Sequence, residues 1–313
     1  MMSTTGNWRL GLFYSTVTTV AWGFLPIALK AMLTWMDAYT IVWYRFVAAM
    51  IIAGAWLIWN GSLPRLMRLD AMGWLILFLA IAGLIGNYVF YILGLRYVSP
   101  GTTQVLIQTA PIFLLLGGVF VFGESFTGRQ WLGLVILIGG IVLFFHNQLA
   151  EIASLSGDLS TGVALITLAS IVWTVYALAQ KSLQRQLSPQ GMLLVIYVVS
   201  TVILLPTADP SSIAGLGLWP LAILAFCSLN TVIAYGSFAE AMHHWEASRI
   251  SAVIALSPLL TILFAQILDV LPTGYESEES MDALRLFGAV VVLAGSATCA
   301  LGGATAKRDG PRA

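Results

Sequence analysis

Apolar stretches of about 20 residues, separated by short polar connections, occupy most of the chain. A helix needs about 20 residues to cross the roughly 30 Å of hydrocarbon in a bilayer, and core helices of soluble proteins are shorter. The stretches that meet this length predict ten transmembrane helices, at residues 10–30, 38–59, 71–94, 101–122, 129–146, 159–181, 190–206, 217–240, 247–269 and 284–302. We therefore expect an all-α membrane protein.

Composition supports this prediction and excludes several other classes of protein. The 313 residues are 59% hydrophobic and 9% charged, whereas soluble domains carry roughly 25% charged residues. The zero formal net charge does not favour a nucleic-acid partner. Cys227 and Cys299 both lie inside apolar stretches, which indicates core residues rather than a disulfide or a metal site. We expect no cofactor, and a lipid bilayer as surroundings.

The distribution of Lys and Arg predicts the orientation, because cytoplasmic connections are enriched in these residues. With the N-terminus in the cytoplasm, the cytoplasmic connections and tails hold Arg9, Arg65, Arg68, Arg129, Lys181, Arg185, Arg249, Lys307, Arg308 and Arg312. The opposite side holds only Lys30, Arg96 and Arg285. We therefore expect a multi-pass protein with both termini in the cytoplasm.

An internal repeat runs through the chain, as in many transporters. The segment Trp22–Lys30 of the first predicted helix is echoed by Trp173–Lys181 of the sixth, 151 residues later. Pro111 in the fourth helix is echoed by Pro258 in the ninth, 147 residues later. Because each unit holds five helices, an odd number, the second unit must be inverted relative to the first.

Glycines continue the repeat in the fifth and tenth predicted helices, at a shared seven-residue spacing: Gly133 and Gly140, then Gly288 and Gly295. Glycines seven apart lie on one helical face and let a neighbouring helix approach closely. We therefore predict two inverted five-helix repeats, residues 1–147 and 148–313, in one integrated membrane domain.

Residues 109–145 resemble the signature of the EamA-type transporters in the drug/metabolite transporter superfamily. The elements that carry this resemblance are Pro111, Gly123-Glu124, Gly133, Gly139-Gly140, the Trp22-Gly23 to Lys30 segment with its echo, and Arg45. The layout, with its many aromatic residues and extended outer loop, is most similar to the bacterial aromatic amino-acid exporters. The second half departs from the pattern, since Asp269-Val270 and an acidic insertion stand where a Gly-Glu pair is usual.

Polar and aromatic residues inside the predicted helices are the candidate substrate site, because such groups are costly in hydrocarbon and normally face the bundle interior. Our candidates are Trp22, Arg45, Asn87, Tyr91, Gln104, Gln108, Trp173, Lys181, Asn230 and Tyr235. The amides and the Tyr91 phenol offer hydrogen bonds to a zwitterion, and Pro111 frees a backbone carbonyl. The paired tryptophans are suited to walls around an apolar or aromatic substrate.

Each candidate also has a structural alternative that the sequence leaves open. For Arg45 the sequence favours a structural tie to a helix end or carboxylate over a substrate or gating contact. The amides are equally consistent with hydrogen bonds between helices. Trp22 and Trp173 are also consistent with core packing, and Lys181 with a topogenic charge.

The duplicated bundle predicts a secondary transporter, not an enzyme, that works by alternating access. The resemblance implies a protein of a bacterial inner membrane that exports neutral or aromatic amino acids or related small metabolites. The chain has no Walker-type motif, so a gradient must supply the energy. Import or exchange of another small metabolite, such as a sugar or drug, is the alternative. An intramembrane enzyme is less favoured, since Glu240, His243-His244 and Glu246 form only a loose interfacial cluster. We expect a monomer, with a dimer left open.

Overall fold

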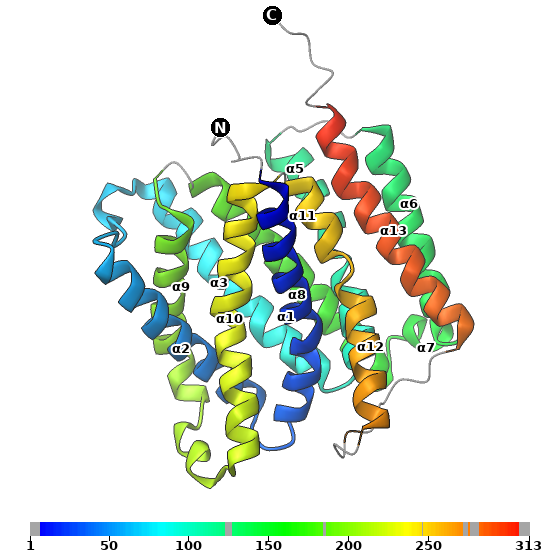
Figure 1. Cartoon of the computed structure of the whole chain (residues 1–313), viewed down its shortest axis with the longest axis horizontal. Coiled ribbons are helices and arrows are strands. Elements are labelled where there is room, and N and C mark those ends of the chain that lie inside the picture. The colour runs from blue at the N-terminus through cyan, green and yellow to red at the C-terminus, as the bar shows by residue number, and fades with distance from the viewer. Residues whose placement is uncertain are drawn as a thin grey trace, which may run out of the picture.

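The computed structural model describes residues 7–122, 127–183, 186–245, 247–271, 275 and 282–306. In this part of the chain all regular structure is helical, which confirms the predicted all-α class, and the helices form one bundle (Figure 1). The acidic run at 276–279, Glu124, Arg185, Glu246 and the basic residues of the C-terminal tail lie outside the described residues.

Helices coincide with every predicted span. The first half holds α1 (Trp8–Met32), α2 (Ala38–Trp59), α3 (Ala71–Leu95), α4 (Pro100–Ile107), α5 (Ala110–Phe122) and α6 (Gly128–Phe144). The second holds α8 (Gly157–Leu183), α9 (Pro189–Leu204), α10 (Leu218–His244), α11 (Ala247–Ile254), α12 (Ser257–Val270) and α13 (Ala283–Ala306). Shorter helices in the connections are η1 (Leu66–Arg68), α7 (Leu149–Ala153), η2 (Leu205–Thr207) and η3 (Pro210–Gly215).

In the described residues, seven helical segments are long and apolar enough to cross a membrane, with Arg249–Val270 taken as one segment. The apolar stretches of α6 and α13 are shorter, and α4 and α5 are short individually. The total of ten spans therefore stays a prediction.

Two predicted spans, 101–122 and 247–269, are not continuous helices. The fourth span is divided into α4 and α5, and the ninth into α11 and α12. A proline has no N–H to donate, and its ring clashes with the carbonyl four residues earlier. The fourth residue before Pro111 is Ile107, where α4 ends, and the fourth before Pro258 is Ile254, where α11 ends. Each proline thus breaks its span at the equivalent place.

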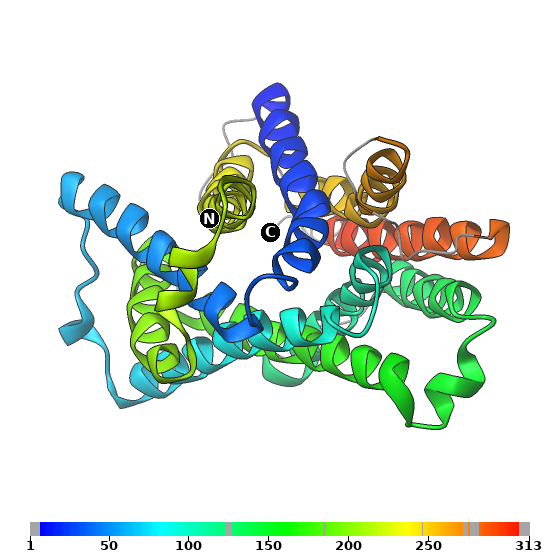
Figure 2. The same cartoon turned by 90° about the horizontal axis from the view of Figure 1, so that it is seen from below.

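The two halves pack as an inverted pair. Contacts between equivalent helices join α6 to α13 and α2 to α9, while the contact of α3 with α8 is matched by that of α10 with α1. In Figure 1, α1 begins at the end of the bundle where α13 finishes, and α8 begins beside α7, away from that end. Seen from below in Figure 2, the α6–α13 pair lies at one edge of the bundle and α2 at the other.

The contact between α6 and α13 is built on the predicted glycines. A Cβ added to Gly140 would lie 2.4 Å from the Val292 nitrogen, and one added to Gly295 would lie 2.4 Å from the Leu137 nitrogen. Gly133 and Gly288 are equally tight against the backbone of the partner helix. The predicted close approach is confirmed, since side chains at these positions would separate the helices.

Candidate substrate site

Arg45 is the central charged residue of the bundle interior. It lies on α2 and is 4% exposed. Its Nε donates to the hydroxyl of Thr231 on α10 at 3.2 Å, and its Cζ lies 4.4 Å from the centre of the Tyr88 ring. No carboxylate among the described residues lies within 4.0 Å of this guanidinium. The interior therefore holds a cation whose neighbours are a hydroxyl and an aromatic face rather than an acid.

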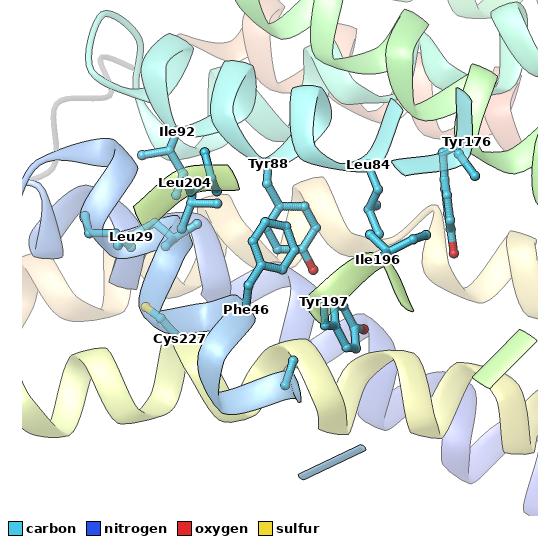
Figure 3. Packing of buried hydrophobic residues seen from close by; sticks show 14 of the residues in the cluster. Leu29, Phe46, Leu84, Tyr88, Ile92, Tyr176, Ile196, Tyr197, Leu204 and Cys227 are labelled. Atoms are coloured by element: carbon cyan, nitrogen blue, oxygen red, sulfur yellow. The ribbon is translucent and has the colours of Figure 1, made fainter. Parts of the chain in front are cut away.

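Tyr88 belongs to a group of packed aromatic side chains from four helices. The Tyr88 ring on α3 stacks on Phe46 of α2, with centroids 4.7 Å apart, and Phe46 is 6.0 Å from Tyr197 on α9. Figure 3 shows these three rings together, with Tyr176 of α8 farther along the same cluster. The positive charge of Arg45 is also near the Tyr197 phenol. We call Phe46, Tyr88, Tyr176 and Tyr197 the aromatic cluster.

Two predicted site residues also lie near the charge. The positive charge of Arg45 is near the phenol groups of Tyr91 on α3 and Tyr235 on α10. Tyr235 meets the Trp22 ring edge to face, with centroids 5.5 Å apart. Trp22 and Trp173 both pack against the main hydrophobic cluster, so neither ring is directed wholly into lipid.

The repeat shows that the charge of Arg45 breaks the symmetry of the two halves. The N-caps of α2 and α9, Asp37 and Ser188, are 151 residues apart, which makes Phe46 equivalent to Tyr197. The same offset pairs Arg45 with Ile196, a fully buried aliphatic residue. The aromatic ring is thus kept in both halves, whereas the cation belongs to the first half alone.

Pro26 frees a carbonyl in the middle of α1 although this helix continues through it. Because proline has no N–H, the carbonyl of Trp22, four residues earlier, has no helical donor. The Nε2 of Gln104 on α4 donates to this oxygen at 2.7 Å. Gln104 therefore supplies the hydrogen bond that the proline removes.

Two further helices attach to the same turn of α1. The Nδ2 of Asn230 on α10 donates to the Ala21 carbonyl at 2.7 Å, and the hydroxyl of Thr261 on α12 donates to the Gly23 carbonyl at 2.6 Å. With Gln104, side chains from α4, α10 and α12 therefore converge on three successive carbonyls. We call this turn the α1 junction.

The remaining candidates lie at other contacts. The Nδ2 of Asn87 donates to the Ala169 carbonyl of α8 at 3.0 Å, and Gln108 lies where the broken helices meet. Lys181 is exposed in the last turn of α8 and does not join the group around Arg45. The amide N–H groups of Asn87, Gln104 and Asn230 each make a hydrogen bond to another helix, which is the structural alternative that the sequence left open. A substrate role for these residues stays a prediction.

Sequence reasoning missed Phe46, Tyr176, Tyr197 and Thr231. A usable signal existed for one of them, because applying the 151-residue offset to Phe46 leads to Tyr197. Thr231 and Tyr176 had no such signal, since a hydroxyl or a ring on an apolar helix looks the same in sequence whether it faces a neighbouring helix or lipid.

Inverted halves that close around buried polar groups define a class of membrane protein, the transporters of small solutes. The chain belongs to the EamA-like transporter family, whose profile matches residues 9–146 and, a second time, residues 160–300. The predicted boundary after residue 147 falls between these two matches.

Similar proteins agree with this assignment. The uncharacterized inner membrane transporter YhbE of Escherichia coli (strain K12) is 39% identical over 294 residues, which cover 94% of this chain and 92% of YhbE. An uncharacterized transporter of Haemophilus influenzae is 37% identical over 295 residues, covering 94% and 95% of the two chains. A solved crystal structure, described only as that of a protein, shares the fold with a TM-score of 0.63 at 17% identity, over 96% of this chain and 98% of the other.

The protein is therefore a multi-pass membrane transporter of the inner-membrane type. The names of its relatives give neither a substrate nor a direction of transport.

Proposed function

We propose that this protein is a secondary transporter that exports neutral and aromatic amino acids, or closely related small metabolites, across a bacterial inner membrane by alternating access. The observation that carries the proposal is Arg45, a buried cation with no carboxylate of the described residues beside it. A charge at this depth is costly unless it is paired. A carboxylate on the substrate supplies the missing partner.

Orphan polar atoms support a zwitterion rather than a simple anion. The Asn230 Oδ1 atom is buried and accepts no hydrogen bond from the described residues, and the Tyr88 hydroxyl is buried and unpartnered in the same sense. An ammonium group can donate to both kinds of oxygen. Buried polar atoms without partners are uncommon in folded proteins, so ligand groups are reasonable partners for these two.

The aromatic residues near Arg45 favour an apolar or aromatic side chain on the substrate. Tyr88 covers the guanidinium, while Trp22 and Tyr235 form an edge-to-face pair on α1 and α10. Aromatic rings prefer edge-to-face and offset contacts and bury large apolar areas. The resemblance to the aromatic amino-acid exporters supports export rather than import. The positive charges of the connections support a cytoplasmic location of both termini.

Uptake into proteoliposomes of the purified full chain tests the substrate class. The panel includes labelled phenylalanine, aliphatic amino acids, a sugar and a cationic drug, each with and without a pH gradient. We expect phenylalanine to move, and to be displaced by tryptophan but not by phenethylamine, which keeps the ring and the amine but lacks the carboxylate. Movement of the sugar or drug without any amino acid would refute the substrate class, and equal competition by phenethylamine would refute the role of Arg45.

The orientation is tested separately with epitope tags on the two ends. In intact cells neither tag should be accessible from outside, and both should be digested by protease in inverted vesicles. Tags on opposite faces of the membrane would contradict the proposed topology and the even number of spans.

A further inference from the structure

The two broken helices are joined to each other at their breaks. Gln108, the C-cap of α4, is 7% exposed. Its Nε2 donates to the carbonyl of Ala255 at 3.3 Å, in the break between α11 and α12. Its Oε1 accepts from the hydroxyl of Ser296 on α13 at 3.2 Å. One amide therefore links the fourth span, the ninth span and α13. We call these two hydrogen bonds the Gln108 clasp.

The clasp connects equivalent positions of the two halves. Pro111 and Pro258 are 147 residues apart, and the same offset places Gln108 opposite Ala255. The contact therefore joins two residues that occupy the same place in the fourth and ninth spans, close to the approximate two-fold axis. At this point the two halves differ, because one carries an amide and the other a methyl group.

Ser296, the second partner of the clasp, also has no polar counterpart in the other half. Gly140 and Gly295, which pack in matching ways between α6 and α13, are 155 residues apart, and this offset pairs Ser296 with Ile141. Isoleucine has no hydroxyl to donate. If the two halves exchanged conformations, Ala255 and Ile141 would stand where Gln108 and Ser296 stand now. Neither hydrogen bond would then be made.

Transporters with inverted repeats alternate between two states in which the halves exchange roles around a central site. We propose that Gln108 is a positioning residue that favours the conformation described here over the exchanged one, because the clasp is available in only one of them. The proposal rests on the alternating access proposed above, but not on the identity of the substrate. Each of the two hydrogen bonds of the clasp is worth about two- to tenfold in the ratio of the two populations.

The test follows the two conformations directly by pulsed EPR distances in proteoliposomes, without substrate. Cys227 and Cys299 are replaced by alanine, and cysteines for spin labels are introduced at exposed positions. In the first pair, Ser62 lies just after α2 and Arg129 lies in the first turn of α6, on one side of the bundle. In the second pair, Ser156 lies just before α8 and Ser211 lies in the connection after α9, on the opposite side. The two pairs report reciprocal opening and closing.

We expect Gln108→Ala, which removes both hydrogen bonds, to lower the ratio of the conformation described here to the exchanged one by at least about fourfold. The exchanged variant, Gln108→Ala with Ala255→Gln, returns an amide to the clasp from the other half and should shift the populations further in the same direction. Thr109→Val is the matched control, because the Thr109 hydroxyl donates only to the Leu106 carbonyl of its own span. This control should leave the populations unchanged.

Unchanged distance distributions in both Gln108 variants would overturn the proposal, as would an equal shift in the Thr109 control. Size-exclusion profiles and melting curves verify that each variant is folded before its distances are compared. If Gln108→Ala does not fold, the exchanged variant, which keeps an amide in the break, still decides the question. A wrong substrate class would leave these distances unaffected, so failure of the clasp and failure of the proposed substrate are distinguishable.

Discussion

Replacing Arg45 by methionine separates the substrate role of this residue from its structural role. Methionine keeps most of the length of the side chain but removes the charge. If Arg45 binds the substrate carboxylate, losing one partner of a buried, hydrogen-bonded ion pair costs about 2–5 kcal/mol of binding free energy. Since about 1.4 kcal/mol corresponds to a factor of ten, phenylalanine should bind at least about 30-fold more weakly.

The free energy of unfolding should change much less, because several contributions offset each other. The variant loses the hydrogen bond to Thr231, worth about 1.5–3 kcal/mol for a charged donor, and the contact with the Tyr88 ring, worth about 0.5–2 kcal/mol. It also removes a cation from the bundle interior, where translocon scales assign a cost of about 2.5–3.5 kcal/mol. We therefore expect a net change of about 2 kcal/mol or less.

The assay combines equilibrium binding of labelled phenylalanine with thermal unfolding in the same detergent. Arg285→Met is the matched control, because Arg285 is also buried, lies 4.7 Å from the Phe144 ring centre and donates to the Thr102 hydroxyl at 3.3 Å. This control should lose stability without losing affinity. Binding by Arg45→Met within about threefold of the wild type would refute the reasoning. A large loss of stability with unchanged affinity would identify Arg45 as the structural tie that the sequence left open.

Three further substitutions test other parts of the structure. Gly140→Ala places a Cβ 2.4 Å from the Val292 nitrogen and should lower stability by about 1–3 kcal/mol in thermal melts, while Gly139→Ala, with open space at its Cβ, should be tolerated. Trp22→Leu should weaken binding of phenylalanine more than that of leucine in competition assays, and equal effects would contradict an aromatic contact. Lys30→Met removes three hydrogen bonds to carbonyls at the end of α3, so the melting temperature should fall by several degrees with substrate affinity unchanged.

Much of the fold was predictable because the signals that determine it are local. Asp37 caps α2 one residue before the predicted start, and the outer ends of the ten spans lie within four residues of the predicted ends. The glycine faces of α6 and α13 were also correctly interpreted, since a seven-residue spacing fixes one helical face. The breaks were only half predicted: Pro111 was expected to free a carbonyl, but the interruption of both spans was not.

The contacts between helices were much harder to predict than the helices themselves. The sequence placed Gln104 in the substrate site but did not indicate that its amide would serve the Trp22 carbonyl, because periodicity shows which face of a helix a residue occupies and not which neighbour that face meets. Arg45 was selected correctly as a buried charge. Its environment, a hydroxyl from α10 and a ring from α3, depends on packing between segments far apart in the chain.

The meeting of Gln108 with Ala255 has a consequence for how such a molecule must be encoded. Two identical five-helix polypeptides assembling in opposite orientations as a two-fold symmetric homodimer would place the same residue on both sides of their symmetry axis. Two glutamines would then face each other, and the two orientations of the assembly would have equal energy. Joining both copies in a single gene removes that constraint. One substitution at the axis is then enough to make one of the transporter's two conformations lower in energy than the other.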